Sequence, residues 1–278
     1  MKKISRRSFL AAAGLSVAAL ALTACGGSAS SVASSVASSA SSDAASTSAA
    51  AGELTTVEAG KLTMATNAAF PPYEMTTDSG EFEGIDIETA QAIADKLGLE
   101  LQIDDMDFDA ALLSVQQGKA DIVMAGVTVT DERKAVMDFS DSYATGIQSV
   151  IVPEGSDIAS PDDLAGKKIG TQRGTTGYIY CSDDFGDDAV VAYDDGLTAV
   201  QALNNGQVDA VVIDNAPAQE FVAANPGLVI LDTSYAEEDY AIGLAKGSAL
   251  EDAVNAALEE LKADGTLQSI VDKYITAE

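Results

Sequence analysis

Arg133 is the residue in this sequence best suited to hold an anion in a defined geometry. Its planar guanidinium offers parallel N–H groups that match the two oxygens of a carboxylate. Arg133 directly follows Asp131 and Glu132, so a surface ion pair with one of these acids is the simple alternative. The residues alone leave both interpretations open.

Asp214 is the matching candidate for a positively charged group. It follows a run of apolar residues, Val211–Ile213, so its carboxylate is expected at the end of a buried strand. The alternative is that Asp214 caps the N-terminus of a helix over 215–224. The two roles are compatible, because one carboxylate has enough acceptor sites for both.

Gly174, Thr175 and Thr176 form a short polar loop between an expected strand, Lys168–Thr171, and an expected helix. Backbone N–H groups and hydroxyls at a helix start suit an anion. Such a tripeptide is a weak signal, and only its position after the strand gives it value.

Composition excludes several classes of function. The 278 residues carry 15 Lys and Arg against 44 Asp and Glu, a formal net charge of −29. This charge repels the phosphates of nucleic acids, so no nucleic-acid partner is expected. The chain has no His, and we expect neither a metal site nor a cofactor. Of the two cysteines, Cys181 is expected to be a core thiol.

Alternating strands and helices position these residues. Apolar periodicity and glycine stops predict the following elements: a strand over Lys61–Thr66, a helix over Ile85–Leu97 capped by Gly98, a strand over Leu99–Ile103, a helix over Ala110–Gln117 closed by Gly118, a strand over Ile122–Ala125 and an amphipathic helix over Ser248–Lys262 with Ala253, Ala257, Leu258 and Leu261 on one side. This alternation favours an α/β architecture with mostly parallel sheets.

An internal repeat predicts two similar halves. The first repeat unit, 110–126, matches the second repeat unit, 198–214, without a gap, and Gly118 corresponds to Gly206. Ligands of open α/β sheets bind beyond the carboxyl ends of strands. The units end at Gly126 and Asp214, so these ends should meet across one cleft. Chance recurrence of a helix–glycine–strand unit is the alternative.

The N-terminus reads as a secretory signal over 1–24, with a basic start and an apolar run shorter than the roughly 20 residues of a spanning helix. A permanent membrane helix is the alternative. The sequence LTAC at Leu22–Cys25 resembles the lipobox of bacterial lipoproteins, which implies a lipid anchor on Cys25; a chance cysteine is the alternative. Ser5–Leu10 resembles a twin-arginine export motif. The Ser/Ala-rich stretch 25–52 is expected to be a flexible linker.

Six segments in order resemble the polar-amino-acid solute-binding proteins of ABC importers (family 3). They are TNAAFPPYE at Thr66–Glu74, GIDIE at Gly84–Glu88, AGVTVTDER at Ala125–Arg133, DFSD at Asp138–Asp141, GTQRGTT at Gly170–Thr176 and DGT at Asp264–Thr266. The resemblance implies a two-lobed, type II periplasmic-binding-protein-like fold with two hinge crossovers, near Ser142–Gln148 and Ser234–Tyr240. Lobe 1 would comprise 53–146 and 240–278, and lobe 2 would be the inserted 150–235.

The same resemblance implies the roles of the site residues. Arg133 would bind the carboxylate of a small polar L-amino acid and Asp214 its ammonium. Gly126 and Thr128 would add a carbonyl and a hydroxyl. Further ligand-binding candidates are the loop Gly174, Thr175 and Thr176, the aromatic walls Phe70 and Phe108, for which core packing is the alternative, and the side-chain readers Asn67, Glu74 and Gln172. Asn67 stands where relatives that favour cationic ligands often have an acid, and Glu74 could restore an acidic contact.

This resemblance implies a monomeric, lipid-anchored extracytoplasmic protein that closes on its ligand and delivers it to an ABC permease. Three alternatives remain from the sequence. They are a cyclohexadienyl dehydratase-like enzyme that uses Glu74 or Asp214, a sensor that presents an amino acid to a signalling receptor, and a surface antigen with a vestigial cleft.

Overall fold

The computed structural model describes residues 54–275, so the expected signal, Cys25 and nearly all of the linker lie outside the described residues. Its main sheet has nine strands, in the order β5-β1-β6-β12-β7-β10-β8-β9, with β11 (Leu228–Ile230) pairing with β7. A second sheet of three short strands contains β2 (Ala69–Phe70), β3 (Glu74–Thr76) and β4 (Phe82–Glu83). Among residues 54–275, no helix is long and apolar enough to cross a membrane.

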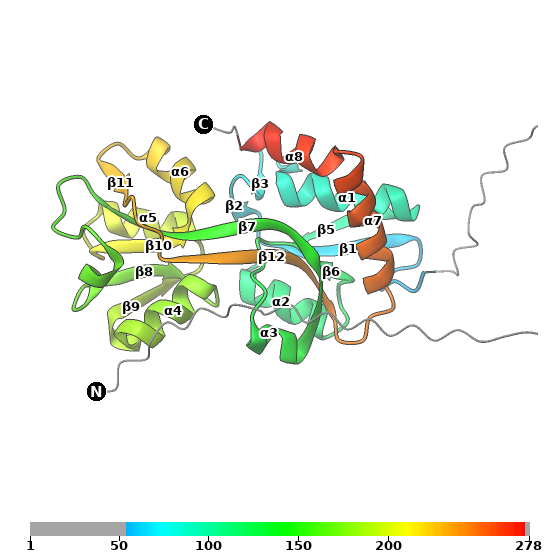
Figure 1. Ribbon diagram of the computed structural model, residues 1–278, viewed down its shortest axis with the longest axis horizontal. Coiled ribbons are helices and arrows are strands. Elements are labelled where there is room, and N and C mark those ends of the chain that lie inside the picture. Colours follow the sequence, from blue (N-terminus) through cyan, green and yellow to red (C-terminus); the bar gives the residue numbers. More distant parts are fainter. Residues whose placement is uncertain (1–53, 276–278) are drawn as a thin grey trace, which may run out of the picture. The chain divides into compact units, whose positions relative to one another are not determined.

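Lobe 1 is built on β1 (Lys61–Thr66), which pairs in parallel with β5 (Glu100–Asp105) and β6 (Ile122–Val123). Helices cover both faces of these strands. One core cluster joins the sheet to α1 (Ile85–Leu97) and α7 (Glu251–Ala263), with α8 (Thr266–Tyr274) beside them. The other cluster packs α2 (Phe108–Gln116) on the opposite face, near α3 (Asp131–Val136) (Figure 1).

Lobe 2 repeats this arrangement on β10 (Ala210–Asp214), β8 (Ile169–Gln172) and β9 (Val190–Tyr193), which are parallel. Its helices are α4 (Thr176–Phe185), α5 (Gly196–Asn204) and α6 (Asn215–Ala224), with short 3-10 turns at Pro161–Leu164 and Asp187–Ala189. Cys181 is fully buried in one of the two core clusters of this lobe, as expected of a core thiol.

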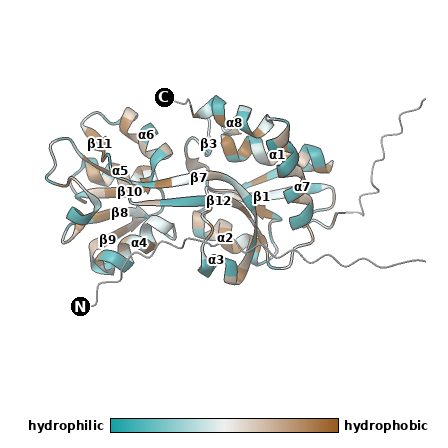
Figure 2. Cartoon of the chain, viewed as in Figure 1, coloured by the Kyte–Doolittle hydropathy of each residue, from teal (hydrophilic) through white to brown (hydrophobic). Residues whose placement is uncertain are grey.

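Two long strands run between the lobes. β7 (Met137–Pro153) and β12 (Ala236–Ala245) pair antiparallel, from Gln148 with Ala236 to Met137 with Ala245. β12 continues onto β6 of lobe 1, and β7 continues onto β10 of lobe 2 (Figure 1). The first half of β12 is hydrophilic where it crosses between the lobes (Figure 2). The predicted two-lobed α/β fold with two crossovers is therefore confirmed, while the exact domain boundaries stay a prediction.

The repeat units have the same local structure. Gly118 and Gly206 both have positive φ, 65° and 66°, after a helix. In the first unit, Asp121 Oδ2 accepts a hydrogen bond from Thr63 N (2.8 Å), and in the second, Asp209 Oδ2 accepts one from Lys168 N (2.7 Å). Each aspartate thus ties its strand to the neighbouring parallel strand.

Some predicted elements match the structure and the boundaries of others shift. The predicted strand Lys61–Thr66 and the predicted helix Ile85–Leu97 match β1 and α1, and Gly98 takes the left-handed conformation expected of a cap. The strand predicted to reach Ala125 ends at Val123, just before Gly126, which has a positive φ. The last predicted amphipathic helix starts at Glu251, after the turn at Gly247, and its buried stripe includes Val254 where Ala253 was expected.

Candidate functional site

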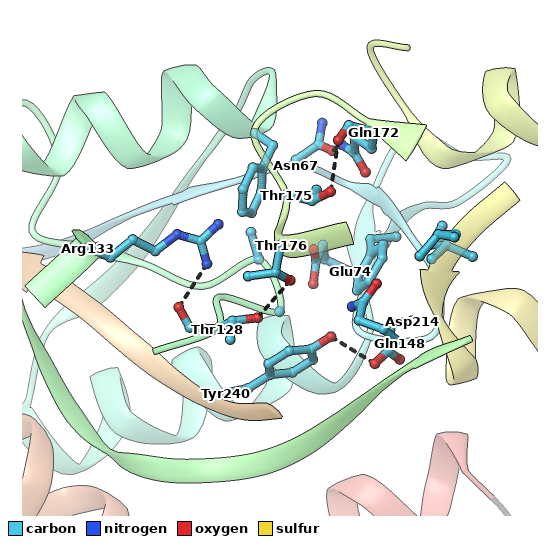
Figure 3. A pocket seen from close by; sticks show the side chains of 16 residues that line it. Asn67, Glu74, Thr128, Arg133, Gln148, Gln172, Thr175, Thr176, Asp214 and Tyr240 are labelled. Atoms are coloured by element: carbon cyan, nitrogen blue, oxygen red, sulfur yellow. Dashed lines mark hydrogen bonds between the residues drawn. The ribbon is translucent and has the colours of Figure 1, made fainter. Parts of the chain in front are cut away.

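A cavity lies between the two lobes, and side chains from both lobes and both crossover strands line it (Figure 3). Its lining residues are Asn67, Phe70, Glu74, Phe108, Ala125, Gly126, Thr128, Arg133, Gln148, Gln172, Thr175, Thr176, Val212, Ile213, Asp214 and Tyr240. The cavity thus brings together every ligand-binding candidate from the sequence except Gly174.

Arg133 enters the cavity from the first turn of α3, whose N-terminus is capped by Thr130. The Arg133 side chain is buried. Its Nη1 donates to the Thr128 carbonyl (2.8 Å) and its Nη2 to the Gly174 carbonyl of lobe 2 (3.1 Å). The guanidinium carbon lies 5.4 Å from the centre of the Phe108 ring. Within residues 54–275, Arg133 forms no ion pair, so the surface pair with Asp131 or Glu132 is not what the structure contains.

Two of the five N–H groups of Arg133 are thus engaged with carbonyls, and the others are left for further acceptors. Burial lowers the pKa of Arg133, and the nearby Glu238 carboxylate opposes that shift. A buried guanidinium with free donors favours an anionic partner, because an unpaired buried charge is costly.

Gly174 does not line the cavity, but its carbonyl accepts a hydrogen bond from Arg133 Nη2. Its φ is 74°, and a Cβ there would lie 1.6 Å from Asp109 Oδ1 of the opposite lobe. Glycine is therefore required at this position, both for the backbone conformation and for the close approach of lobe 1. Its expected contribution of an N–H group to a ligand stays a prediction.

Asp214 lies across the cavity from Arg133 (Figure 3). Its Oδ1 accepts from Ala216 N (3.1 Å), so it does cap α6, as the alternative interpretation held. Its Oδ2 accepts from Ile147 N (2.7 Å) and from the Tyr240 hydroxyl (2.9 Å). Burial raises the pKa of Asp214 to about 6, against the lowering effect of these three hydrogen bonds.

Asn67 and Gln172 meet across the two lobes. Gln172 Nε2 donates to Asn67 Oδ1 (2.8 Å), and Asn67 Nδ2 donates to the Met106 carbonyl (3.0 Å). Asn67 follows β1 and Gln172 ends β8, so each amide comes from the carboxyl end of a strand. Their proposed part in reading a ligand side chain stays a prediction.

The two phenylalanines line the cavity in different ways. Phe108 is buried, belongs to the core of lobe 1 and faces Arg133. Phe70 is partly exposed and stacks on Tyr73 with ring centres 5.8 Å apart. The absence of a side chain at Gly126 leaves room for the Phe70 ring, because a Cβ at this position would lie 2.8 Å from Phe70 Cε1. Phe108 therefore combines the core role with a place in the cavity wall.

A family model described as "Bacterial extracellular solute-binding proteins, family 3" matches residues 62–277, nearly all of the folded chain. The chain belongs to this family. The probable histidine-binding protein of Neisseria gonorrhoeae is 34% identical over 275 residues, which covers 96% of this chain and 95% of that protein. The L-cystine-binding protein TcyJ of Escherichia coli (strain K12) is 34% identical over 226 residues, covering 80% and 85%.

Solved structures of similar proteins share the fold. An ancestral arginine-binding protein bound to arginine is 42% identical with a TM-score of 0.74, covering 78% of this chain and 98% of that chain. The arginine-, lysine-, histidine-binding protein ArtJ from Geobacillus stearothermophilus is 34% identical with a TM-score of 0.75, covering 78% and 96%. All four relatives are named as binding proteins and not as enzymes.

Three polar residues of this solute-binding protein at or beside the cavity were missed by sequence reasoning. They are Gln148 on β7, and Glu238 and Tyr240 on β12. Gln148 and Tyr240 line the cavity, and Glu238 lies behind it as a buried carboxylate. A signal did exist, since the crossovers were expected to end at Gln148 and Tyr240. A strand that passes between two lobes can direct side chains into the cleft, as Gln148 and Tyr240 do.

Glu238 links both lobes through one oxygen. Its Oε2 accepts from Thr128 Oγ1 (3.1 Å), Thr176 Oγ1 (2.9 Å) and Gln148 Nε2 (3.1 Å). A threonine hydroxyl has a single proton, so Thr128 and Thr176 orient theirs toward Glu238. Thr175 likewise donates to the Gln172 carbonyl (2.8 Å) while it caps α4. In this arrangement the N–H groups of Arg133 are the free cationic donors for a ligand carboxylate.

Proposed function

We propose that this protein captures a polar L-amino acid in the cavity between its lobes and delivers it to the permease of an ABC importer. The observation that carries the proposal is that Arg133 of lobe 1 and Asp214 of lobe 2 line opposite sides of one buried cavity. A zwitterion carries both of the charges that these two groups complement. The names of the relatives, which include binding proteins for histidine, cystine and arginine, support the same class of ligand.

The ligand carboxylate would bind the free N–H groups of Arg133. Two parallel N–H groups can bind both carboxylate oxygens, and such charge-assisted pairs are the strong ones in proteins. The ligand ammonium would bind Asp214 and the carbonyl of Gly126. Asp214 already accepts three hydrogen bonds that favour its ionised form, and an ammonium beside it would favour that form further.

The ligand side chain would extend toward Phe70, Phe108, the Asn67–Gln172 pair and Glu74. Rings suit the apolar stem of a long polar side chain, and the amide and carboxyl groups suit its polar end.

Binding would be coupled to a hinge motion about β7 and β12, in which the lobes open to admit the ligand and close around it. Three direct contacts join the lobes beside the cavity, at Arg133–Gly174, Asn67–Gln172 and Thr128–Thr176 (3.4 Å between the hydroxyls). Ligand entry into a buried cavity requires these contacts to open, and a ligand bound to both lobes favours their closing.

The mature protein would be a monomer outside the cytoplasm, held at the membrane by a lipid on Cys25 through the 25–52 linker. Mass spectrometry of the N-terminal peptide tests this part. A diacylglyceryl-modified Cys25 is the expected result, and a mature chain without Cys25 would contradict the anchor.

A thermal-shift screen against the twenty amino acids, ornithine, citrulline and cystine tests the function. A ligand at about 100 times its Kd stabilises the folded state by about 2.7 kcal/mol. For a protein of this size the melting temperature should rise by roughly 5–10 °C. A polar amino acid should give this shift, and no shift from any of these compounds would contradict the proposal.

A further inference from the structure

We propose that Glu238 is a latch between the lobes, whose buried carboxylate stabilises the closed form and slows ligand release without touching the ligand. This inference rests on the proposed function and deepens it, because it assigns a positioning residue to the closing of the lobes. A residue that acts on closing alone should affect every amino acid that binds by the same factor.

Glu238 stands on β12 where this strand crosses between the lobes (Figure 1). The next residue, Asp239, is tied to lobe 1, because its carbonyl accepts a hydrogen bond from Val129 N (3.0 Å). On the other side, Tyr235 N donates to the carbonyl of Gln148 (2.7 Å), at a position where β7 already pairs with β10 of lobe 2. Glu238 therefore lies within the hinge, between the ties to the two lobes.

The Glu238 side chain reaches both lobes from this position. Its Oε2 accepts from Thr128 Oγ1 of lobe 1 (3.1 Å) and from Thr176 Oγ1 of lobe 2 (2.9 Å). Gln148 Nε2 donates to the same oxygen (3.1 Å). Thr128 forms a β-bridge with Tyr240 of β12, so Thr128 and Glu238 stay together when the lobes move. The contact with Thr176 spans the hinge, and opening of the lobes must break it.

The surroundings of Glu238 make the contact with Thr176 a strong one. The Glu238 side chain is buried, and a hydrogen bond to a charged acceptor is about twice as strong as one between neutral groups. Thr176 is the first residue of α4, and the N-terminus of a helix favours a negative charge beside it. Oε1 of Glu238 is buried without a partner among residues 54–275, so Oε2 carries these contacts alone.

Glu238 acts on a ligand only indirectly. Thr128 and Thr176 line the cavity, with their hydroxyls 3.4 Å apart, and Glu238 lies behind them (Figure 3). The affinity for a ligand rises with the fraction of the protein in the form that binds it. A ligand enclosed between the lobes leaves only when they open, so a contact that stabilises the closed form lowers the release rate.

The variants Glu238→Ala and Glu238→Gln test the latch, and Glu237→Ala is the matched control. Glu237 is the preceding residue of β12 and is exposed, so its replacement removes the same charge from the hinge. Calorimetry gives the affinity of each protein for those of arginine, histidine, glutamine and cystine that bind the wild type. Exchange of the bound radiolabelled amino acid against an excess of the unlabelled one gives the release rate.

Glu238→Ala should lose about tenfold in affinity for every ligand, through a release rate that is faster by about the same factor. Glu238→Gln keeps an acceptor oxygen for the threonine hydroxyls and should lose only about threefold. Glu237→Ala should change both quantities by less than about twofold. A purely structural role of Glu238 would lower the amount of folded protein and leave the release rate of the folded protein unchanged.

Unchanged or tighter binding by Glu238→Ala would overturn the latch, and tighter binding would mean that the cost of burying Oε1 exceeds the gain from the contacts of Oε2. Losses that differ by tenfold or more between ligands would also overturn it, because they would place Glu238 in contact with the ligand. If Glu238→Ala does not fold, an unchanged release rate in Glu238→Gln overturns the latch. All these results leave the proposed function intact, whereas failure of every amino acid to bind the wild type would overturn that function.

Discussion

The two repeat units form opposite walls of the cavity with one backbone plan and two different final residues. Each consists of a helix, a glycine with positive φ, an aspartate bonded to the neighbouring strand, and a buried strand. The first unit ends in Gly126, which offers only its backbone, and the second ends in Asp214, which offers a carboxylate. The duplicated part is therefore the scaffold, while the chemistry lies in the residue that ends each unit.

The largest expected effect comes from removing the charge of Asp214, so that both units end in an uncharged residue. Asp214→Asn keeps the size of the side chain and a good helix cap, but it removes the charge opposite the ligand ammonium. We expect a loss of ligand affinity of about 2–5 kcal/mol, because one partner of a buried charge pair is gone. Calorimetry measures this loss, and an unchanged Kd would remove Asp214 from the site.

The same substitution should change how stability depends on pH. Burial raises the pKa of Asp214 from 3.8 to about 6, so the folded protein binds this proton more tightly than the unfolded chain. This contribution favours folding below pH 4 and is lost as pH rises from about 4 to 6. When the pH rises from 4 to 7, the free energy of unfolding of Asp214→Asn should therefore fall by up to about 3 kcal/mol less than that of the wild type.

Urea unfolding of both ligand-free proteins at the two pH values gives this difference. The general repulsion of a strongly negative chain affects both proteins, so it largely cancels. Parallel pH profiles would show that Asp214 titrates normally in the folded state.

Gly126→Ala tests the first unit at its end. The φ of 55° disfavours any L side chain, and the new Cβ would lie 2.8 Å from Phe70 Cε1. We expect about 2–3 kcal/mol of destabilisation. Gly118→Ala is the matched control, since its φ is 65° with nothing within 4 Å, and it should cost only about 1 kcal/mol. Equal costs for the two variants would show that Phe70 yields without strain.

The smallest expected effect is the loss of stability on replacing Asp121 or Asp209, the aspartates that occupy corresponding positions in the two repeat units. Asp121 is buried and accepts from both Val57 N (2.7 Å) and Thr63 N (2.8 Å), whereas Asp209 is exposed and accepts from Lys168 N. Asp121→Asn should cost about 1–2 kcal/mol and Asp209→Asn about 0.5 kcal/mol in denaturant unfolding. A larger cost at Asp209 would mean that the units are not equivalent as scaffolds.

The sequence predicted the scaffold better than the site. Local signals were enough for β1, α1 and the Gly98 cap, because apolar periodicity and a glycine stop act within a few residues of each other. Asp214 and Arg133 could be singled out because their chemistry is strong and their positions follow from strand and helix ends.

Three features required tertiary structure. Glu238 stands among other acids in a hydrophilic stretch, and only the crossing of β12 between the lobes buries it against Thr128 and Thr176. Glu74 at the start of β3 and Asp86 in α1 are both fully buried, which depends on how these elements pack and which no local pattern encodes. The Gly174 carbonyl contacts Arg133 only because the lobes are closed.

The central claim is tested most directly by calorimetry. It would measure the affinity of Arg133→Ala and of Arg173→Ala for the amino acid that the screen identifies. Arg173 is an exposed arginine of lobe 2 whose Nη2 lies 3.6 Å from Asp194 Oδ1. Its replacement therefore controls for the loss of one positive charge outside the cavity. Arg133→Ala should weaken binding by at least about 2 kcal/mol, because the ligand carboxylate would be buried without its partner. Arg173→Ala should change binding by less than about 0.5 kcal/mol. Unchanged affinity in Arg133→Ala would contradict the account.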